Sequence, residues 1–159
     1  MTGARVSQLA QLQVQDLQAG CDTPRLMVPT SRKGKAKKSI QHRPVPIPRS
    51  LAEKLVAVSD GRSMGTPLLV KPNGAPWKKS DHSRPFARAA KAADQDPERV
   101  TLYALRHSSI VRQILAGVPV RVVAVNHDTS VVMLERTYSR YIGDHSDALA
   151  RTALLDSSE

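Results

Sequence analysis

The sequence predicts an α+β fold that is mostly helical and carries a small antiparallel β-sheet. Short apolar segments bounded by proline and glycine occur only in the first half of the 159-residue chain. The last third has apolar residues at the three- and four-residue spacing that is typical of helices. No change in composition marks a second domain, and a chain of this length can bury a core without disulfide or metal support.

The first expected elements are a short helix and a hairpin. The apolar residues of 6–12 predict the helix. Residues 25–29 and 43–48 are apolar segments on either side of a stretch rich in Lys, Gly and Ser, which predicts two strands joined by a long basic tip. Their prolines suit the edge of a sheet, because proline cannot donate to a neighbouring strand. Residues 68–70 are a further candidate strand.

Helices account for most of the remaining chain. Ser50 precedes Leu51, Leu55 and Val58, a spacing that predicts a helix face with Ser50 as its cap. Pro85 lies in the helix expected over residues 80–93, where it fits only the first turn. Further helices are expected over residues 80–93, 102–115 (before Gly117), 120–125, 131–141 and 146–155.

The chain is strongly basic, with 24 Lys and Arg against 14 Asp and Glu and a formal net charge of +10. Such an excess favours a polyanionic partner, because phosphate contacts release counterions from nucleic acid. No apolar run is long enough to span a membrane and the amino terminus does not resemble a signal peptide, so a cytoplasmic protein is expected. Cys21 is the only cysteine and the histidines are scattered, so no disulfide, metal or cofactor is expected.

Four clusters along the chain contain residues suited to phosphate chemistry. The first is Thr2-Gly3-Ala4-Arg5-Val6-Ser7. The second is the basic tip, where we expect DNA contacts from Arg32, Lys35, Lys37, Lys38 and Arg43, together with Lys33. The third is Tyr103-Ala104-Leu105-Arg106-His107, and the fourth runs from Asn126-His127 to Tyr138.

These clusters resemble the conserved boxes of the tyrosine recombinase (phage integrase) family. The first is similar to that family's TGxRxSE motif, the third to its HxLRH box, and the fourth to its closing GH…Y box, in the same order along nearly the whole chain. Each box alone is commonplace, whereas the ordered set is specific. The resemblance implies a catalytic domain that performs site-specific DNA recombination or integration by cutting and rejoining strands.

The resemblance assigns five catalytic residues, and their chemistry suits the roles. Arg5 and Arg106 are expected to clamp the phosphate oxygens with forked hydrogen bonds. Tyr138 is the expected nucleophile, and His127 the expected donor to the same phosphate. Lys33 is the expected general acid for the leaving 5′ oxygen, with Lys35 as the alternative. The implied product is a 3′-phosphotyrosyl link, formed without metal or cofactor.

The chain departs from the family pattern at three positions. Tyr103 stands where relatives have a histidine that helps to manage the nucleophile's proton, Gln8 replaces a glutamate, and Asn126 replaces a glycine. Tyr103 and His107 are expected beside the catalytic residues, and His107 could instead be merely structural.

The family also normally carries an N-terminal DNA-clamping domain before the first arginine box, which lies at the start of this chain. We therefore expect residues 1–159 to form a single, incomplete catalytic domain without the core-binding domain. The resemblance further implies a homo-tetramer on double-stranded DNA.

Two other functions are compatible with the charge. The chain could be a non-catalytic DNA-binding remnant of an integrase, or an RNA-binding structural protein, although aromatic residues are only 3% of the chain and suit base stacking poorly. At residue level, the basic run could be a solvated loop, and Tyr138 and Tyr141 could both be core aromatics on one helix face.

Overall fold

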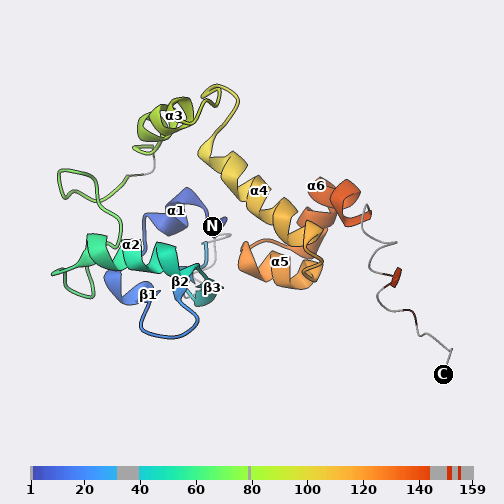
Figure 1. The fold of residues 1–159 in the computed structure, drawn as a ribbon, viewed down its shortest axis with the longest axis horizontal. Helices are drawn as coiled ribbons and strands as arrows, with labels where there is room; N and C mark the ends of the chain where they lie inside the picture. Colours follow the sequence, from blue (N-terminus) through green and yellow to red (C-terminus); the bar gives the residue numbers. More distant parts are fainter. Residues whose placement is uncertain (1, 32–39, 79, 144–149, 152–153, 155–159) are drawn as a thin grey trace.

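The computed structural model describes residues 2–31, 40–78, 80–143, 150–151 and 154. Short strands and helices occupy the first half of the chain and helices the second, which confirms the predicted α+β class (Figure 1). The elements, in order, are α1 (Val6–Leu9), η1 (Val14–Asp16), β1 (Leu17–Gln18), β2 (Arg25–Pro29), β3 (His42–Pro46), α2 (Arg49–Ser59), α3 (Ser83–Ala92), α4 (Leu102–Leu115), α5 (Val120–Asn126) and α6 (Val131–Gly143).

The three strands form an antiparallel sheet in the order β1-β2-β3. The predicted hairpin is β2 and β3, with Leu26 opposite Val45 and Val28 opposite Arg43. Side chains alternate along β3, so Arg43 and Val45 are buried while their neighbours are exposed. β3 lies at the sheet edge, as its prolines predict. The same prediction was wrong for β2, which is the central strand and carries Pro29 only as its last residue. The expected basic tip falls on residues 32–39, outside the described residues.

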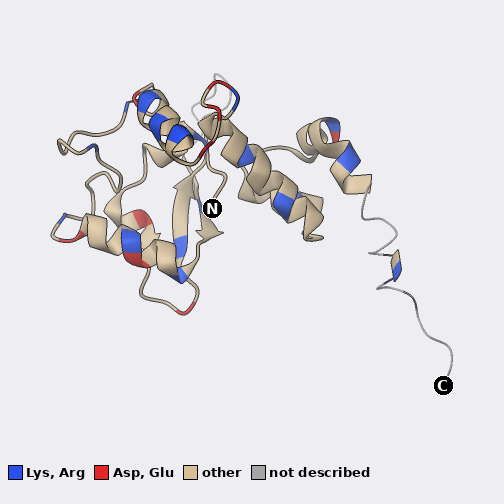
Figure 2. Cartoon of the chain, turned by 45° about the horizontal axis from the view of Figure 1, so that its top comes forward, with Lys and Arg blue, Asp and Glu red and all other residues tan. Residues whose placement is uncertain are grey.

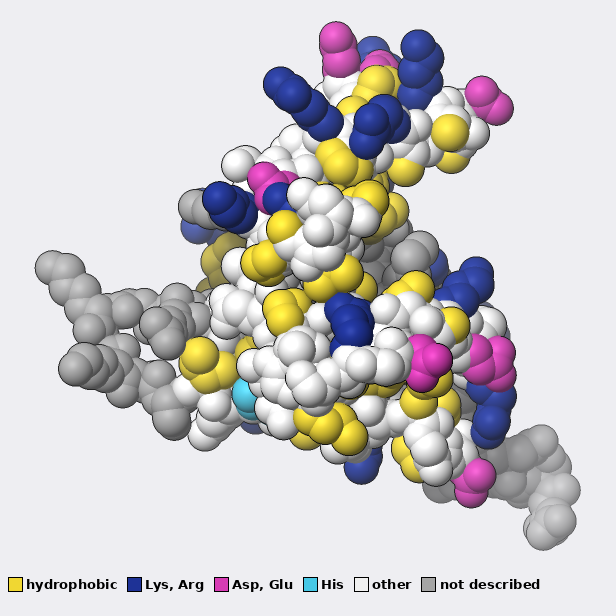
Figure 3. Space-filling view, turned by 90° about the vertical axis from the view of Figure 1, so that its left-hand side faces the viewer, with side chains coloured by type: hydrophobic (Ala, Val, Ile, Leu, Met, Phe, Trp, Pro, Cys, Tyr) yellow, Lys and Arg dark blue, Asp and Glu magenta, His cyan; other side chains and the backbone are white. Residues whose placement is uncertain are grey.

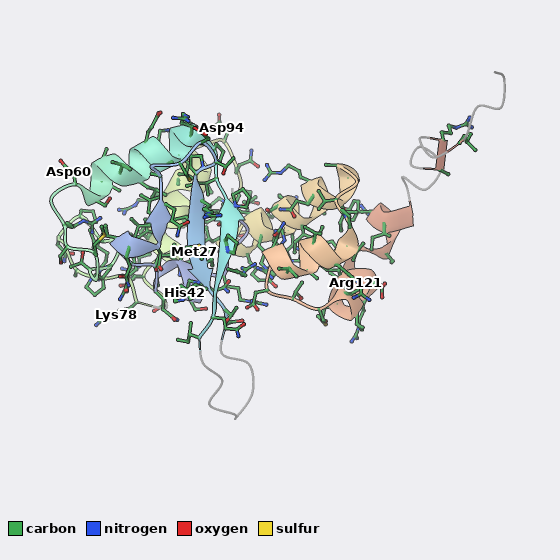
Figure 4. All side chains as sticks on the ribbon, turned by 90° about the horizontal axis from the view of Figure 1, so that it is seen from below. Met27, His42, Asp60, Lys78, Asp94 and Arg121 are labelled. Atoms are coloured by element: carbon green, nitrogen blue, oxygen red, sulfur yellow. The ribbon has the colours of Figure 1, made fainter. Side chains whose placement is uncertain are left out.

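The first hydrophobic cluster lies between the sheet and α2. Leu26 and Val28 from β2 pack with Ala52 and Leu55 from α2, and Leu68 is fully buried beside them. Figure 4 shows the sheet between α2 and the helices α4–α6, with Met27 in the sheet and Arg121 on the far side. The sheet therefore has α2 against one side and faces the helical half on the other.

The second cluster joins α4, α5 and α6. Ile110 and Ile114 of α4 pack against Val123 of α5 and against Leu134 and Tyr138 of α6. Gly117 has a φ of +72° between α4 and α5, a conformation that glycine adopts without steric cost and that ends a helix. The predicted bounds of α4 are therefore correct.

Several local predictions were wrong. α1 ends at Leu9 because Leu12 leaves the helix and accepts a backbone hydrogen bond from Leu68. Pro48, not Ser50, is the N-cap of α2, and Val58 is exposed. The remaining differences are that β1 was not predicted, residues 67–70 make only isolated bridges, and α3 begins at Ser83.

The expected helix at 146–155 lies largely outside the described residues. Within the part of the chain that is described, no helix has both the length and the apolarity needed to cross a membrane.

Two adjacent valines on α5 test how much the second cluster contributes to stability. Val123 is 0% exposed and Val122 is 46% exposed. We expect Val123→Ala to lower the free energy of unfolding by about 2 kcal/mol, because two buried methyl groups are lost and a cavity remains. Val122→Ala on the same helix should change it by less than about 0.5 kcal/mol. Urea denaturation of both variants is the measurement, and equal midpoints would contradict this packing.

Candidate active site

Three arginine side chains meet at the carboxyl end of α5. The last carbonyls of a helix have no partner within it and lie at the negative end of its dipole, so cationic donors stabilise them. Each arginine donates to one backbone carbonyl in this segment: Arg43 to Val125, Arg106 to His127, and Arg5 to Asp128. The first and third recombinase-like boxes thus converge on the fourth.

Arg5 is held by two groups from distant parts of the chain. Its Nη1 donates to Asp128 Oδ2 at 2.7 Å and to Ser31 Oγ at 3.0 Å, and its Nη2 donates to the Asp128 carbonyl at 2.9 Å. The Arg5 side chain is 26% exposed. The guanidinium is therefore fixed in place, yet remains accessible from solvent.

The Asp128 carboxylate joins the two halves of the site. Its Oδ2 also accepts from the backbone N–H and the hydroxyl of Ser31, and from Gln8 Nε2 at 3.3 Å. Asp128 has a φ of +49°, a conformation that aspartate tolerates better than most residues. Asp128 lies in the fourth box but had no predicted role, although Gln8 was recognised as a missing carboxylate. In the fold, Asp128 supplies a carboxylate within hydrogen-bond reach of Gln8.

Arg106 is almost fully buried, with 4% of its surface exposed. Its Nη1 donates to the Gly3 carbonyl at 2.7 Å, two residues before Arg5. Burial lowers the pKa of Arg106, and the Arg5 charge lowers it further, while Tyr103 and Tyr138 act in the opposite direction. A guanidinium stays protonated at neutral pH, so both expected clamps are cations.

His127 is fully buried and both of its ring nitrogens are engaged. Nδ1 donates to the Val123 carbonyl at 3.0 Å, which leaves Nε2 as the acceptor for the Ser109 hydroxyl at 3.1 Å. Burial is the main reason why the pKa of His127 is lowered to about 4, and Arg106 and Arg43 add to it. The ring is therefore neutral at pH 7. Its expected hydrogen bond to a phosphate stays a prediction, since Nε2 would first have to leave Ser109.

Gly3 is required by the position of the His127 ring. A Cβ at Gly3 would lie 2.6 Å from two ring atoms of His127 and 3.0 Å from Ser109 Cβ, and Gly3 has a φ of +59°. Any side chain would push against a buried ring and also strain the backbone. The threonine-glycine pair before Arg5 therefore has a packing cause that sequence reasoning did not identify.

Tyr138 is buried within α6, with 6% of its surface exposed. Its backbone departs from helical geometry, with φ −126° and ψ 16°, so the helix is kinked there. The hydroxyl lies 2.5 Å from His107 Nδ1. Burial raises the pKa of Tyr138 and Tyr103 raises it further, while Arg106 lowers it. The group at rest is a neutral phenol.

The side chains of Tyr103, His107 and Tyr138 form a row of rings. The Tyr103 and His107 rings meet edge to face with centroids 4.9 Å apart, and His107 and Tyr138 lie 5.6 Å apart. Tyr103 is 56% exposed and begins the row at the surface. Tyr141 packs against the same hydrophobic cluster as Tyr138, as the core-aromatic alternative expected, and its hydroxyl accepts a hydrogen bond from Arg140.

The structure brings together four of the five expected catalytic residues, namely Arg5, Arg106, His127 and Tyr138. Lys33 falls outside the described residues, as do Arg32, Lys35, Lys37 and Lys38. Arg43 was expected at the DNA surface but is only 9% exposed, because the strand alternation turns it inward. Burial lowers its pKa to about 10, and its Nε and Nη2 have no hydrogen-bond partner among the described residues.

The described residues contain no cluster of three or more His, Cys, Asp or Glu that could hold a metal ion. What the site offers is positive charge beside a buried phenol. Guanidinium groups at fixed positions stabilise negative charge on phosphate oxygens, and a phenol can attack phosphorus as a nucleophile.

Comparison with protein families matches residues 1–141 to the phage integrase family. The fold and the ordered site define a tyrosine recombinase catalytic domain, and the chain belongs to the phage integrase family. The family resemblance inferred from the boxes is thus confirmed. The search of curated proteins gave no match.

Solved structures share the fold. XerA recombinase is 24% identical with a TM-score of 0.66, covering 95% of this chain and 51% of that one. The Tn1549 transposon integrase in complex with transposon right end DNA is 21% identical with a TM-score of 0.69, covering 96% and 56%. XerH recombinase bound to its difH substrate is 18% identical with a TM-score of 0.63, covering 98% and 42%. The chain thus spans about half the length of these proteins.

Alanine at Gly3 should be far more damaging than alanine at another glycine of the same backbone type. Gly74 has a φ of +77° with nothing within 4 Å of its Cβ position, so Gly74→Ala suffers only the backbone strain, about 1 kcal/mol. Gly3→Ala suffers that strain and the contact with His127. We expect it to lose at least about 2 kcal/mol more in urea denaturation. Equal losses would contradict the position of the His127 ring.

Acid should destabilise the fold through His127. The pKa is about 4 in the folded chain and about 6.5 when unfolded, so the unfolded state takes up the proton first. The neutral His127 ring therefore contributes about 3 kcal/mol to the free energy of unfolding above pH 6.5, and this contribution is lost as the pH falls towards 4. Urea denaturation across this range measures it. His127→Gln should lack most of this pH dependence, and the exposed His42→Gln should retain it; the reverse result would refute the assignment.

Proposed function

We propose that this chain is a DNA strand-exchange catalytic domain that cleaves duplex DNA through Tyr138 and rejoins it to a new 5′ hydroxyl. Its immediate product would be a 3′-phosphotyrosyl link, which conserves the energy of the broken bond. No ATP, metal or other cofactor takes part. In this proposal the active assembly is a tetramer on two duplexes, as the family resemblance implies, acting on DNA in the bacterial cytoplasm.

One observation carries the proposal. Arg5 and Arg106 lie 101 positions apart in the sequence, yet they bind adjacent carbonyls, those of Asp128 and His127. The two arginines and the phenol also act on one another electrostatically, because the Arg5 charge lowers the pKa of Arg106 and the Arg106 charge lowers the pKa of Tyr138. Two fixed cations and a neutral phenol within electrostatic range form the set that phosphodiester attack requires.

The roles follow from charge. A phosphodiester resists attack because its oxygens are negative, and the two arginines would neutralise that charge as it grows in the pentavalent transition state. The same positive field would ease formation of the phenolate as Tyr138 attacks. For His127 to donate a hydrogen bond to the phosphate, its ring would first have to leave Ser109. Lys33, which the family resemblance assigns, is the proposed acid for the departing oxygen.

Duplex DNA is the proposed partner. The Tn1549 integrase structure contains transposon DNA and the XerH structure contains its difH substrate, and phosphate contacts suit a chain with a net charge of +10. Figure 2 shows Lys and Arg along α3 and α4, while Figure 3 shows basic and acidic side chains interspersed on the face it draws. The proposed phosphate-binding positions are therefore the site itself and the tip at 32–39, rather than the face in Figure 3.

Trapping a covalent adduct on nicked duplex DNA tests the proposal. The substrate would be fragments of the DNA flanking the gene, and a denaturing gel would reveal the protein–DNA adduct. We expect an adduct with the wild type, none with Tyr138→Phe, and wild-type levels with Tyr141→Phe, because Tyr141 bonds to Arg140 instead of lying in the site.

A full-length family member on its own site is the positive control. Salt-dependent duplex binding without any adduct would favour the alternative, a non-catalytic DNA-binding remnant. Loss of the adduct in Tyr141→Phe instead of Tyr138→Phe would overturn the assigned nucleophile.

A further inference from the structure

Among the described residues, the Tyr138 hydroxyl forms a hydrogen bond with the imidazole of His107. The Oη–Nδ1 distance is 2.5 Å, at the short limit of O–H donors. His107 lies on α4 directly after Arg106, so the same turn of helix carries a phosphate clamp and the partner of the nucleophile. This contact joins α4 to α6 across the helical core.

We propose that His107 is a catalytic residue of this chain, which accepts the phenolic proton of Tyr138 as the phenol attacks phosphorus. The inference rests on the proposed function, since it assigns a proton acceptor to that reaction. It also gives His107 a direct role, where the sequence indicated only a neighbouring one.

The bond from Tyr138 Oη to phosphorus forms while the bond from phosphorus to the 5′ oxygen breaks, and the phenolic proton moves to His107 Nδ1. The 5′ oxygen leaves as a hydroxyl with a proton from a separate acid, Lys33 in the proposal above. Rejoining reverses each transfer, and His107 returns its proton to Tyr138 as the phenol departs.

Helix geometry places Tyr103 and His107 together. Residues i and i+4 of a helix project from the same face, and the two rings meet edge to face with centroids 4.9 Å apart. Of the two, it is His107 that bonds to the Tyr138 hydroxyl. Tyr103 is a poor candidate itself, because a phenol is a weak base near pH 7 and its charged form raises the pKa of Tyr138.

A purely structural contact makes a different prediction. A buried hydroxyl needs a hydrogen-bond partner, and glutamine can provide one as well as histidine can, without acting as a base. Histidine alone supplies a nitrogen that takes up a proton near neutral pH. Replacement by glutamine therefore separates the two readings.

The experiment measures the single-turnover rate of adduct formation on saturating nicked duplex, together with duplex affinity. We expect His107→Gln and His107→Ala to slow adduct formation about 100-fold with unchanged affinity. Added imidazole should restore part of the rate in His107→Ala and none in Tyr138→Phe. Tyr103→His combined with His107→Ala should also regain activity, because it returns an imidazole to the same face. His82→Ala, which removes an imidazole elsewhere, is the matched control.

A wild-type rate in His107→Gln would overturn the proposal and leave a structural hydrogen bond. So would a loss of affinity that accounts for the slower rate, or a failure of imidazole to act on His107→Ala. No adduct with the wild type would instead overturn the proposed function itself. An adduct with the wild type that forms equally fast in both His107 variants would overturn the role of His107 alone.

Discussion

The structure depends on how the carboxyl end of α5 is satisfied. A seven-residue helix has few internal hydrogen bonds, and its last carbonyls need donors from elsewhere. Arginines from the first box, the sheet edge and α4 donate to the carbonyls of Asp128, Val125 and His127, and the Val125 carbonyl also accepts from the Asp128 N–H. One short segment thus fixes the sheet against the helical half and, by the same bonds, fixes the cations that the proposed chemistry uses.

Placing three arginines together has an electrostatic cost, and Asp128 offsets part of it. Burial and mutual repulsion lower the pKa of Arg106 and of Arg43. The Asp128 carboxylate binds Arg5 directly and raises the pKa of Arg43. A carboxylate bound to a clamp also competes with phosphate for it. The remaining exposure of Arg5 is therefore important, because a substrate must approach a guanidinium that already has protein partners.

Local pattern in the sequence was enough to predict the elements that bury one face. The apolar spacing predicted the bounds of α4, and the ordered boxes predicted that Arg5, Arg106 and Tyr138 would meet. The inward turn of Arg43 was also predictable, because a period of two places it on the same strand face as the buried Val45. That alternation was overlooked in favour of the charge of the side chain.

Other features could not be read from local pattern. The contact of Gly3 with the His127 ring joins residues 124 positions apart, and no periodicity encodes it. The role of Asp128 needs both the left-handed backbone after α5 and the approach of Ser31 from the end of β2. The exact start of α2 could not be predicted either, because its N-cap, Pro48, makes no side-chain capping hydrogen bond.

The resting site is ready for some steps of the proposed reaction and not for others. Arg5 and Arg106 are held in place before any substrate arrives, and preorganised charge is the most effective form of electrostatic catalysis. Tyr138, however, is buried, and His127 is committed to Val123 and Ser109. The kink at Tyr138 interrupts α6 at the residue proposed to attack the phosphorus. The proposed reaction therefore requires a local change in α6 rather than in the arginine cluster, and DNA binding is the proposed event that favours it.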